Sequence, residues 1–154
     1  MKGIVTIISL FMALGVIAQR YEVEQVHLTD RGKSKICPVR YKEGILFMSN
    51  QKSQILKTVR DETGELPYNL YYQSLDKTRI NGELQVFSEE LSTDFNDGPA
   101  SFSADQKTVY FSRTIDINKV ADSKRSRILG IFSSTKGDDG TWGEPEPFKY
   151  NLES

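Results

Sequence analysis

The sequence contains one cysteine and one histidine in 154 residues, and this scarcity excludes several kinds of chemistry. Because Cys37 is alone, no disulfide can form within the chain, and zinc sites built from several thiolates are excluded. His27 has no Cys or Glu partners at metal-ligand spacing, so we expect it in an outer strand or on the surface. We therefore expect neither a metal nor a cofactor.

Cys37 precedes Pro38 at the start of an apolar stretch. This position favours a small buried hydrophobic side chain over a reactive thiol. Pairing of this single cysteine between two chains is the remaining alternative.

Signatures of hydrolases and nucleotide-binding proteins are absent from the sequence. It has no Gly-x-Ser-x-Gly elbow and no glycine-rich phosphate loop. The stretch Ser134–Trp142, "STKGDDGTW", faintly resembles the Asp-box of sialidases, but Gly140 directly precedes Thr141 and the spacer residue is missing. The residues Asp138, Asp139 and Gly140 are more typical of a hairpin turn. We therefore expect no enzymatic activity, with a glycan-processing or glycan-binding protein as the alternative.

Apolar residues form one long run, and that run is confined to the N-terminus. Lys2 and the apolar residues 4–17 are typical of a secretion signal, with cleavage expected before Gln19. The run is shorter than the roughly 20 residues that span a membrane, although an uncleaved anchor is the alternative. Removing 18 of the 154 residues leaves 136, a usual size for one domain.

The chain also lacks a charge excess. Without Lys2, 19 basic side chains stand against 21 acidic ones, so no long-range attraction for nucleic acid or anionic lipid is expected. The basic run 124–127, "KRSR", invites a nucleic-acid interpretation, but a solvated loop is the better interpretation in a chain of net negative charge.

An internal repeat is the most informative feature that is present. Pro38 recurs as Pro99 at an interval of 61 residues, and the same interval relates seven further pairs. They are Tyr41 and Phe102, Leu70 and Ile131, Tyr71 and Phe132, Gly82 and Gly143, Glu83 and Glu144, Phe87 and Phe148, and Leu91 and Leu152. Phe47 and Phe111 lie 64 residues apart, because the turn that precedes Phe111 is longer. Length changes confined to turns are typical of a repeated strand unit.

The sequence pattern of each unit predicts four short antiparallel strands, because runs rich in Ile, Val, Phe and Tyr lie between turn residues. The expected strands are 37–41, 44–49, 69–75 and 83–87 in the first unit, and 100–103, 108–113, 129–134 and 145–149 in the second. Gly44 and Gly140 are expected to take positive φ in hairpins. The intervals 51–65 and 115–127 are expected to be polar loops.

Four-stranded units that recur in this way predict an all-β β-propeller, in which blades pack face to face. Phe47, Tyr71, Phe111 and Phe132 would then lie between blades, Asp105 would cap a turn, and Trp142 would pack on the outer part of its blade. The structural residues of the repeat are Pro38, Tyr41, Gly44, Phe47, Pro99, Phe102, Asp105, Phe111, Gly140 and Trp142.

The stretch 99–107, "PASFSADQK", followed by "VYF" at 109–111, resembles the WD40-like repeats of TolB-type and OmpA-family envelope proteins. Their blade signature runs Pro, two residues, Phe-Ser-Pro-Asp-Gly-Lys, then an apolar Tyr-Phe. Ala104 and Gln106 replace the usual proline and glycine, so we expect a looser turn. Two stretches, "FNDGPASFS" at 95–103 and "LGIFSSTKGDDGTWGEPEPFKYN" at 129–151, resemble sequences of one OmpA-family subgroup. Some members of this subgroup are similar to components of the type IX secretion apparatus.

The resemblance implies a binding and scaffold module without catalytic residues, at the periplasmic side of the outer membrane. We expect a signal peptide (1–18), an extended segment (19–34) and two blades (35–95 and 96–154), a partial propeller ending before a third blade. Such a chain is expected to be a fragment of a longer protein or to associate with itself through open blade edges. Expected partners are envelope proteins or further blades. Alternatively, Tyr68, Tyr72 or Trp142 would stack on a sugar or peptide.

Overall fold

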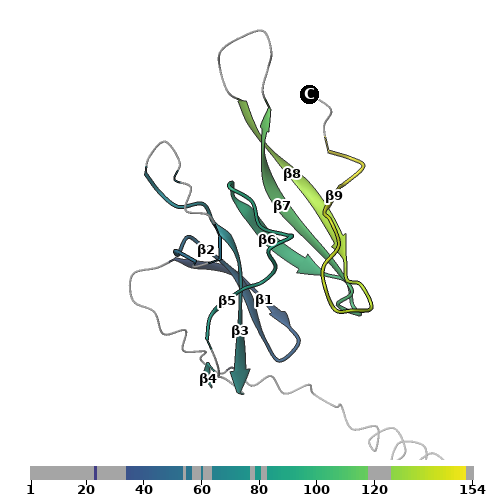
Figure 1. Ribbon diagram of the computed structural model, residues 1–154. Helices are drawn as coiled ribbons and strands as arrows, with labels where there is room; N and C mark the ends of the chain where they lie inside the picture. Colours follow the sequence, from purple (N-terminus) through teal and green to yellow (C-terminus); the bar gives the residue numbers. More distant parts are fainter. Residues whose placement is uncertain are drawn as a thin grey trace, which may run out of the picture.

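The computed structural model describes residues 23, 34–53, 55–56, 60, 64–76, 79–80, 83–117 and 126–151. Within these residues the secondary structure consists of nine strands in two antiparallel sheets, with no helix (Figure 1). The all-β prediction is therefore confirmed for the described part of the chain. His27, the predicted signal peptide 1–18 and most of the segment 19–34 lie outside it.

The first sheet contains β1 (Lys35–Tyr41), β2 (Gly44–Ser49), β3 (Asn69–Asp76), β4 (Arg79–Ile80) and β5 (Gln85–Val86). Its order is β1–β2–β3, and both short strands pair with β3. Leu75 faces Ile80 of β4, and Tyr71 faces Val86 of β5. Five strands thus occupy four positions across the sheet.

The second sheet contains β6 (Asp97–Phe102), β7 (Thr108–Ile117), β8 (Ser126–Thr135) and β9 (Glu146–Pro147), in that order. All eight predicted strands are present in the predicted order. The strand boundaries differ from the prediction. β7 continues to Ile117 and β8 begins at Ser126, so both strands enter the interval 115–127 that we expected to be a loop. The last strand of each unit is shorter than predicted, and β4 was not predicted.

The first strand of each sheet contains the same irregularity. The pairing register shifts between Ile36 and Val39 in β1 and between Asp97 and Ala100 in β6. In both bulges the residue before the proline has positive φ, 52° at Cys37 and 106° at Gly98, and the Gly98–Pro99 peptide is cis. The predicted burial of Cys37 is wrong, because this residue lies in the bulge, outside the paired register, and its thiol is exposed.

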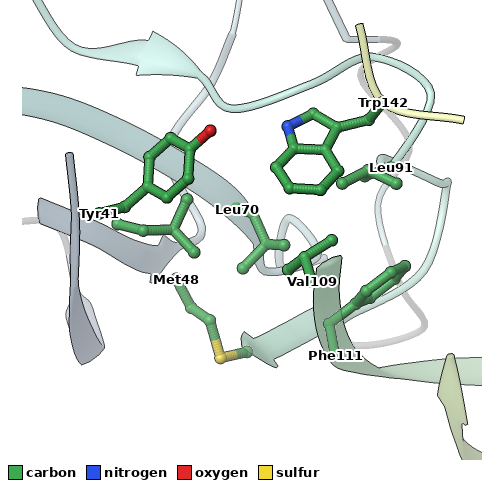
Figure 2. Packing of buried hydrophobic residues seen from close by; sticks show 8 residues of the cluster. Tyr41, Met48, Leu70, Leu91, Val109, Phe111 and Trp142 are labelled. Carbon is green, nitrogen blue, oxygen red and sulfur yellow. The ribbon is translucent and has the colours of Figure 1, made fainter. Parts of the chain in front are cut away.

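The two sheets pack through one face of each. Leu46, Met48, Leu70 and Tyr72 lie on one face of the first sheet because alternate residues of a strand share a face. They belong to a core that includes Val109, Phe111 and, partly buried, Phe132 from the second sheet. Figure 2 shows Leu70 of the first sheet close to Val109 of the second in this core. The backbone of β6 comes closest to the first sheet (Figure 1), where it contacts β1, β2 and β3.

The two faces in contact are not equivalent in the repeat. The second sheet uses Phe111 and Phe132, whose repeat partners are Phe47 and Tyr71. Phe47 and Tyr71 are buried and face each other across β2 and β3, but they lie on the other face of the first sheet. Of the four predicted inter-sheet residues, Phe111 and Phe132 therefore lie in the seam, and Phe47 and Tyr71 do not. The sheets therefore pack head to tail, which means that one face of the first sheet contacts the opposite face of the second.

The face of the first sheet that bears Phe47 and Tyr71 also carries polar groups. Tyr71 Oη donates a hydrogen bond to the carbonyl oxygen of Gln51 at 3.0 Å. Three other buried polar atoms of this sheet, Ser49 Oγ, Asn69 Oδ1 and Gln73 Oε1, have no hydrogen-bond partner among the described residues. Alternation places them on the same face as Tyr71, at either end of the aromatic pair.

Gly44 does not take the positive φ that we predicted. Lys42 takes it instead, with φ of 46°, in the two-residue turn between the paired residues Tyr41 and Gly44. A Cβ at Gly44 would lie 2.4 Å from the carbonyl oxygen of Gln73 and 2.6 Å from the Tyr72 ring. The glycine is needed for this close approach between β2 and β3, and not for backbone freedom.

Replacing Gly98 by alanine is expected to destabilise the fold strongly. A Cβ there would lie 2.7 Å from Met48 Cγ and 2.9 Å from Leu70 Cδ2, at a φ of 106°. Backbone strain and overpacking together predict a loss of about 2–4 kcal/mol in the free energy of unfolding, measured by urea titration. Gly64→Ala is the matched control, since its φ is 82° and no atom lies within 4 Å of the new Cβ. An equal loss in both variants would contradict the packing argument.

Candidate functional site

Four aromatic rings meet at one end of the seam between the sheets. Tyr41 ends β1, Phe87 follows β5, Phe102 ends β6, and Trp142 lies in the hairpin after β8. The Tyr41 and Phe102 rings are stacked with centroids 4.5 Å apart, and Phe87 meets Tyr41 edge to face at 5.2 Å. The Trp142 ring lies 5.5 Å from that of Phe87. This cluster joins four segments that are distant in the sequence.

A cleft of about 270 Å³ opens beside this aromatic cluster. Its lining includes Lys42, Tyr72, Gln85, Glu90, Lys136 and Thr141. These residues come from the β1–β2 turn, β3, the segment that begins at β5, and the hairpin after β8. The cleft is thus formed by both repeats together, and its size approaches the lower end of ordinary ligand pockets.

Two lysines supply positive charge to the cleft. Lys136 Nζ donates a hydrogen bond to Tyr41 Oη at 3.0 Å and lies 5.4 Å from the centroid of the Trp142 ring. Lys42 Nζ lies 5.6 Å from the centroid of the Tyr41 ring. Among the described residues, the ion pair formed is that between Arg113 and Asp97. Neither lysine therefore has a carboxylate partner in the described part of the chain. Both ammonium groups lie over aromatic rings, and that of Lys136 also donates to a neutral hydroxyl.

The phenol groups of the cleft remain protonated at neutral pH. Burial raises the pKa of Tyr41, which the charge of Lys42 partly offsets. Burial also raises the pKa of Tyr72, and the Glu43 carboxylate adds to this effect. Both groups can therefore donate hydrogen bonds.

A carboxylate is also present in the cleft. Glu90 Oε2 accepts a hydrogen bond from Ser88 Oγ at 2.6 Å, and this bond lowers the pKa of the Glu90 carboxyl. Glu90 is therefore ionised at neutral pH. The cleft thus carries positive and negative charge around the aromatic residues Tyr41, Phe87 and Trp142 that line it.

A buried ion pair connects the second sheet to the segment that links the two units. Asp97 accepts hydrogen bonds from Arg113 Nε and from the Thr93 amide, both at 2.6 Å, and from Thr93 Oγ1 at 2.8 Å. Arg113 also donates to the Leu91 carbonyl at 3.1 Å, and its guanidinium lies 5.0 Å from the Phe111 ring centroid. Burial raises the pKa of the Asp97 carboxyl, and the hydrogen bond and charge of Arg113 offset part of this rise.

The pairing of Asp97 with Arg113 is not predicted by the sequence. The repeat does not predict this pair, because the residues at the equivalent positions of the first unit are Ile36 and Ser49. The signal available in the sequence is an acidic residue beside the Gly98 bulge. That signal does not identify its cation.

The turn residues of the second unit lie as predicted. Asp105 Oδ1 accepts hydrogen bonds from Ser103 Oγ at 2.6 Å and from the Lys107 amide at 3.0 Å, and the Ser103 bond lowers the Asp105 pKa. Gln106 takes a φ of 57°, a conformation that glycine usually supplies. Its Oε1 accepts from the Lys42 amide at 3.0 Å, so the turn is tied to the first unit rather than loosened.

The last hairpin also forms at the predicted residues. Gly140 has a φ of 86°, and Asp139 Oδ1 accepts from the Thr141 amide at 3.0 Å. The backbone hydrogen bond of Thr141 and then that of its side chain lower the pKa of Asp139. Trp142, which we expected on the outer part of its blade, lies in this hairpin between β8 and β9. Its ring is buried in the seam near Tyr41 (Figure 2).

The remaining predicted repeat residues are also placed. Pro38 and Pro99 follow the two bulge residues and are exposed. Tyr41 and Phe102 occupy equivalent positions in the two units and stack on each other in the cluster. Tyr68 packs on the core, and its amide donates to Asn96 Oδ1 at 2.8 Å.

Comparison with known proteins gave no match to any family model, curated protein or solved structure. In the described part of the chain, no helix is long and apolar enough to cross a membrane. The same residues contain no group of three or more His, Cys, Asp or Glu side chains placed to hold a metal ion.

Removing the Asp97 carboxylate is expected to be costly because it leaves the Arg113 guanidinium partly buried without a counter-charge. We expect Asp97→Ala to lower the free energy of unfolding by about 3–5 kcal/mol. Asp94→Ala, an exposed acid in the same segment, is the control, with an expected change within about 0.5 kcal/mol.

A double-mutant cycle tests whether this loss belongs to the ion pair. Asp97→Ala combined with Arg113→Met should cost less than the sum of the two single changes, with a coupling of about 0.5–3 kcal/mol in urea unfolding. Additive losses would show that the carboxylate acts through Thr93 and not through Arg113.

Proposed function

We propose that the chain is a non-enzymatic scaffold that binds other proteins through the faces of its sheets. In this proposal it is the propeller part of an envelope protein similar to the OmpA family, at the periplasmic side of the outer membrane. The observation that carries the scaffold role is an exposed apolar face on the second sheet whose repeat counterpart is covered.

This outer face carries the exposed residues Tyr110, Leu129, Ile131 and Phe148. The exposed fraction is 40% for Tyr110 and 49% for Ile131, against 0% and 1% for their repeat partners Leu46 and Leu70. The two partners are covered because the second sheet packs on them. Equivalent positions thus differ in burial only because one sheet has a neighbour on this side.

A sheet with a face like that of Phe111 and Phe132 would cover the outer face in the same way. The contact within the chain is heterologous, since it joins two different faces of similar units. Repeated contacts of this kind are the packing principle of β-propellers, which supports the resemblance stated for the sequence. Contiguous apolar area on a sheet face also commonly marks a protein interaction site.

The envelope location rests on the sequence alone. The leader of residues 1–18 carries a basic start and an apolar stretch, as exported proteins do. We include export, with cleavage before Gln19, in the proposal for this reason. The partners proposed are envelope proteins or further sheets of the same kind.

The aromatic cleft favours glycan binding as a second candidate. Tyr72 and Phe87 are half-buried and line the cleft, where sugar rings could stack on them. Trp142 and Tyr41 are already packed against other rings, so they are poorly placed to stack on a sugar. Binding to a glycan array that is lost in Tyr72→Ala would favour this candidate over the scaffold.

A photo-crosslinking amino acid at Leu129 tests the scaffold function directly. We expect an adduct in the envelope fraction of the organism that makes the protein. Ile131→Glu should abolish the adduct, because the carboxylate would be buried unpaired in the interface. Since Ile131 is exposed in the chain alone, the free energy of unfolding should change by about 0.5 kcal/mol or less.

Lys107→Glu, on an exposed turn, is the matched control and should keep the adduct. Mass spectrometry of the adduct should identify an envelope protein or another copy of this chain. A chain present in the envelope without any Leu129 adduct would overturn the scaffold role. A chain recovered only from the cytoplasm would overturn the location.

A further inference from the structure

The cleft holds charge that the packing of the sheets does not require. Lys42 and Lys136 have no ion pair with a described residue, yet both ammonium groups line the cleft. Lys136 is half-buried, and its hydrogen bond to Tyr41 Oη uses only one of its three donors. The cleft therefore offers unused donors and two positive charges to a ligand.

These groups match a carboxylate. An ammonium group forms charge-assisted hydrogen bonds to carboxylate oxygens, and an aromatic floor lowers the local dielectric in which the pair forms. Glu90 lines the same cleft and repels a second carboxylate, so an acidic group is directed toward the lysines. The volume of about 270 Å³ suits one residue-sized group rather than a long chain.

The position of β5 indicates that the carboxylate belongs to a peptide. Gln85 and Val86 of β5 line the cleft, and among described strands β5 pairs only with β3. On its other side no described strand pairs with β5, and an extended peptide can add there through backbone hydrogen bonds. An acidic side chain of such a peptide would enter the cleft next to this edge.

We propose that the cleft binds an acidic extended peptide of a partner protein, with a Glu or Asp carboxylate held by Lys136 and Lys42 and the peptide backbone along β5. The proposal rests on the proposed scaffold function and specifies a second, separate contact for it. The outer face of the second sheet is not part of this contact.

Calorimetric titration of the purified chain with two synthetic nine-residue peptides tests the proposal. One alternates Glu with Val, and the other replaces each Glu by Gln. We expect the Glu peptide to bind at least tenfold more tightly than the Gln peptide at low salt, and the difference to shrink at 0.5 M NaCl.

Two variants locate the contact. Lys42→Gln should weaken binding of the Glu peptide about threefold, and Lys42→Gln with Lys136→Gln about tenfold or more. Lys107→Gln removes a lysine outside the cleft and should leave binding unchanged. Thermal unfolding of each variant separates lost binding from lost folding, because the Lys136 change also removes the bond to Tyr41.

Equal affinity for the two peptides would overturn the proposal. So would a loss of Glu-peptide binding in Lys107→Gln as large as that in the variant with both cleft lysines replaced. Tighter binding of an oligogalacturonate than of the Glu peptide, sensitive to the lysine variants, would assign the cleft to acidic glycans instead. Ile131→Glu should bind the Glu peptide normally. Failure of the crosslinking experiment and failure of this one are therefore distinguishable.

Discussion

Burial of one sheet face against the opposite face of the next is the interaction on which the rest of the structure depends. Leu46 and Leu70 are removed from water only because Phe111 and the second sheet lie over them. Each fully buried side chain of this size contributes about 1.5–3 kcal/mol, so the seam supplies a large part of the stability. The same contact brings Tyr41, Phe87, Phe102 and Trp142 together, and all of them except Phe102 line the cleft.

Within this seam, polar groups fix the relative position of the sheets more narrowly than apolar contact does. The Asp97 carboxylate is aligned by Thr93 and Arg113, and Arg113 extends to the Leu91 carbonyl of the linking segment. At the other end of β6 and β7, the Lys42 amide meets Gln106 Oε1. Hydrophobic attraction is non-directional, whereas these bonds have fixed geometry. They explain how two simple sheets adopt one arrangement.

The sequence was sufficient to predict features that depend on local order. Alternation of apolar residues and turn residues predicted all eight main strands, and Asp105 and Gly140 lie in the predicted turns. Features that depend on which side of a strand meets a neighbour were predicted less well. Phe47 lies away from the seam and Trp142 lies inside it, because a periodic pattern places a residue on a face without stating what covers that face.

Backbone irregularities account for the other errors. The bulge at Cys37 changes the direction of one side chain without changing the composition of the strand, so the thiol was wrongly expected to be buried. Gly44 was assigned to backbone freedom, whereas it is required by the approach of Tyr72. The Asp97–Arg113 pair was missed because it has no counterpart in the first unit. Such contacts depend on tertiary structure.

The head-to-tail contact gives the pair of sheets a direction. One end presents Ile131 and Tyr110, whereas the other bears Phe47 and Tyr71, beside oxygens of Ser49, Asn69 and Gln73 that have no partner among the described residues. Further units that repeat the contact between the two sheets would all be added in the same polarity. The rotation from one sheet to the next then determines whether such an array closes into a ring or continues as an open helix. In a closed ring, the number of units would follow from that angle.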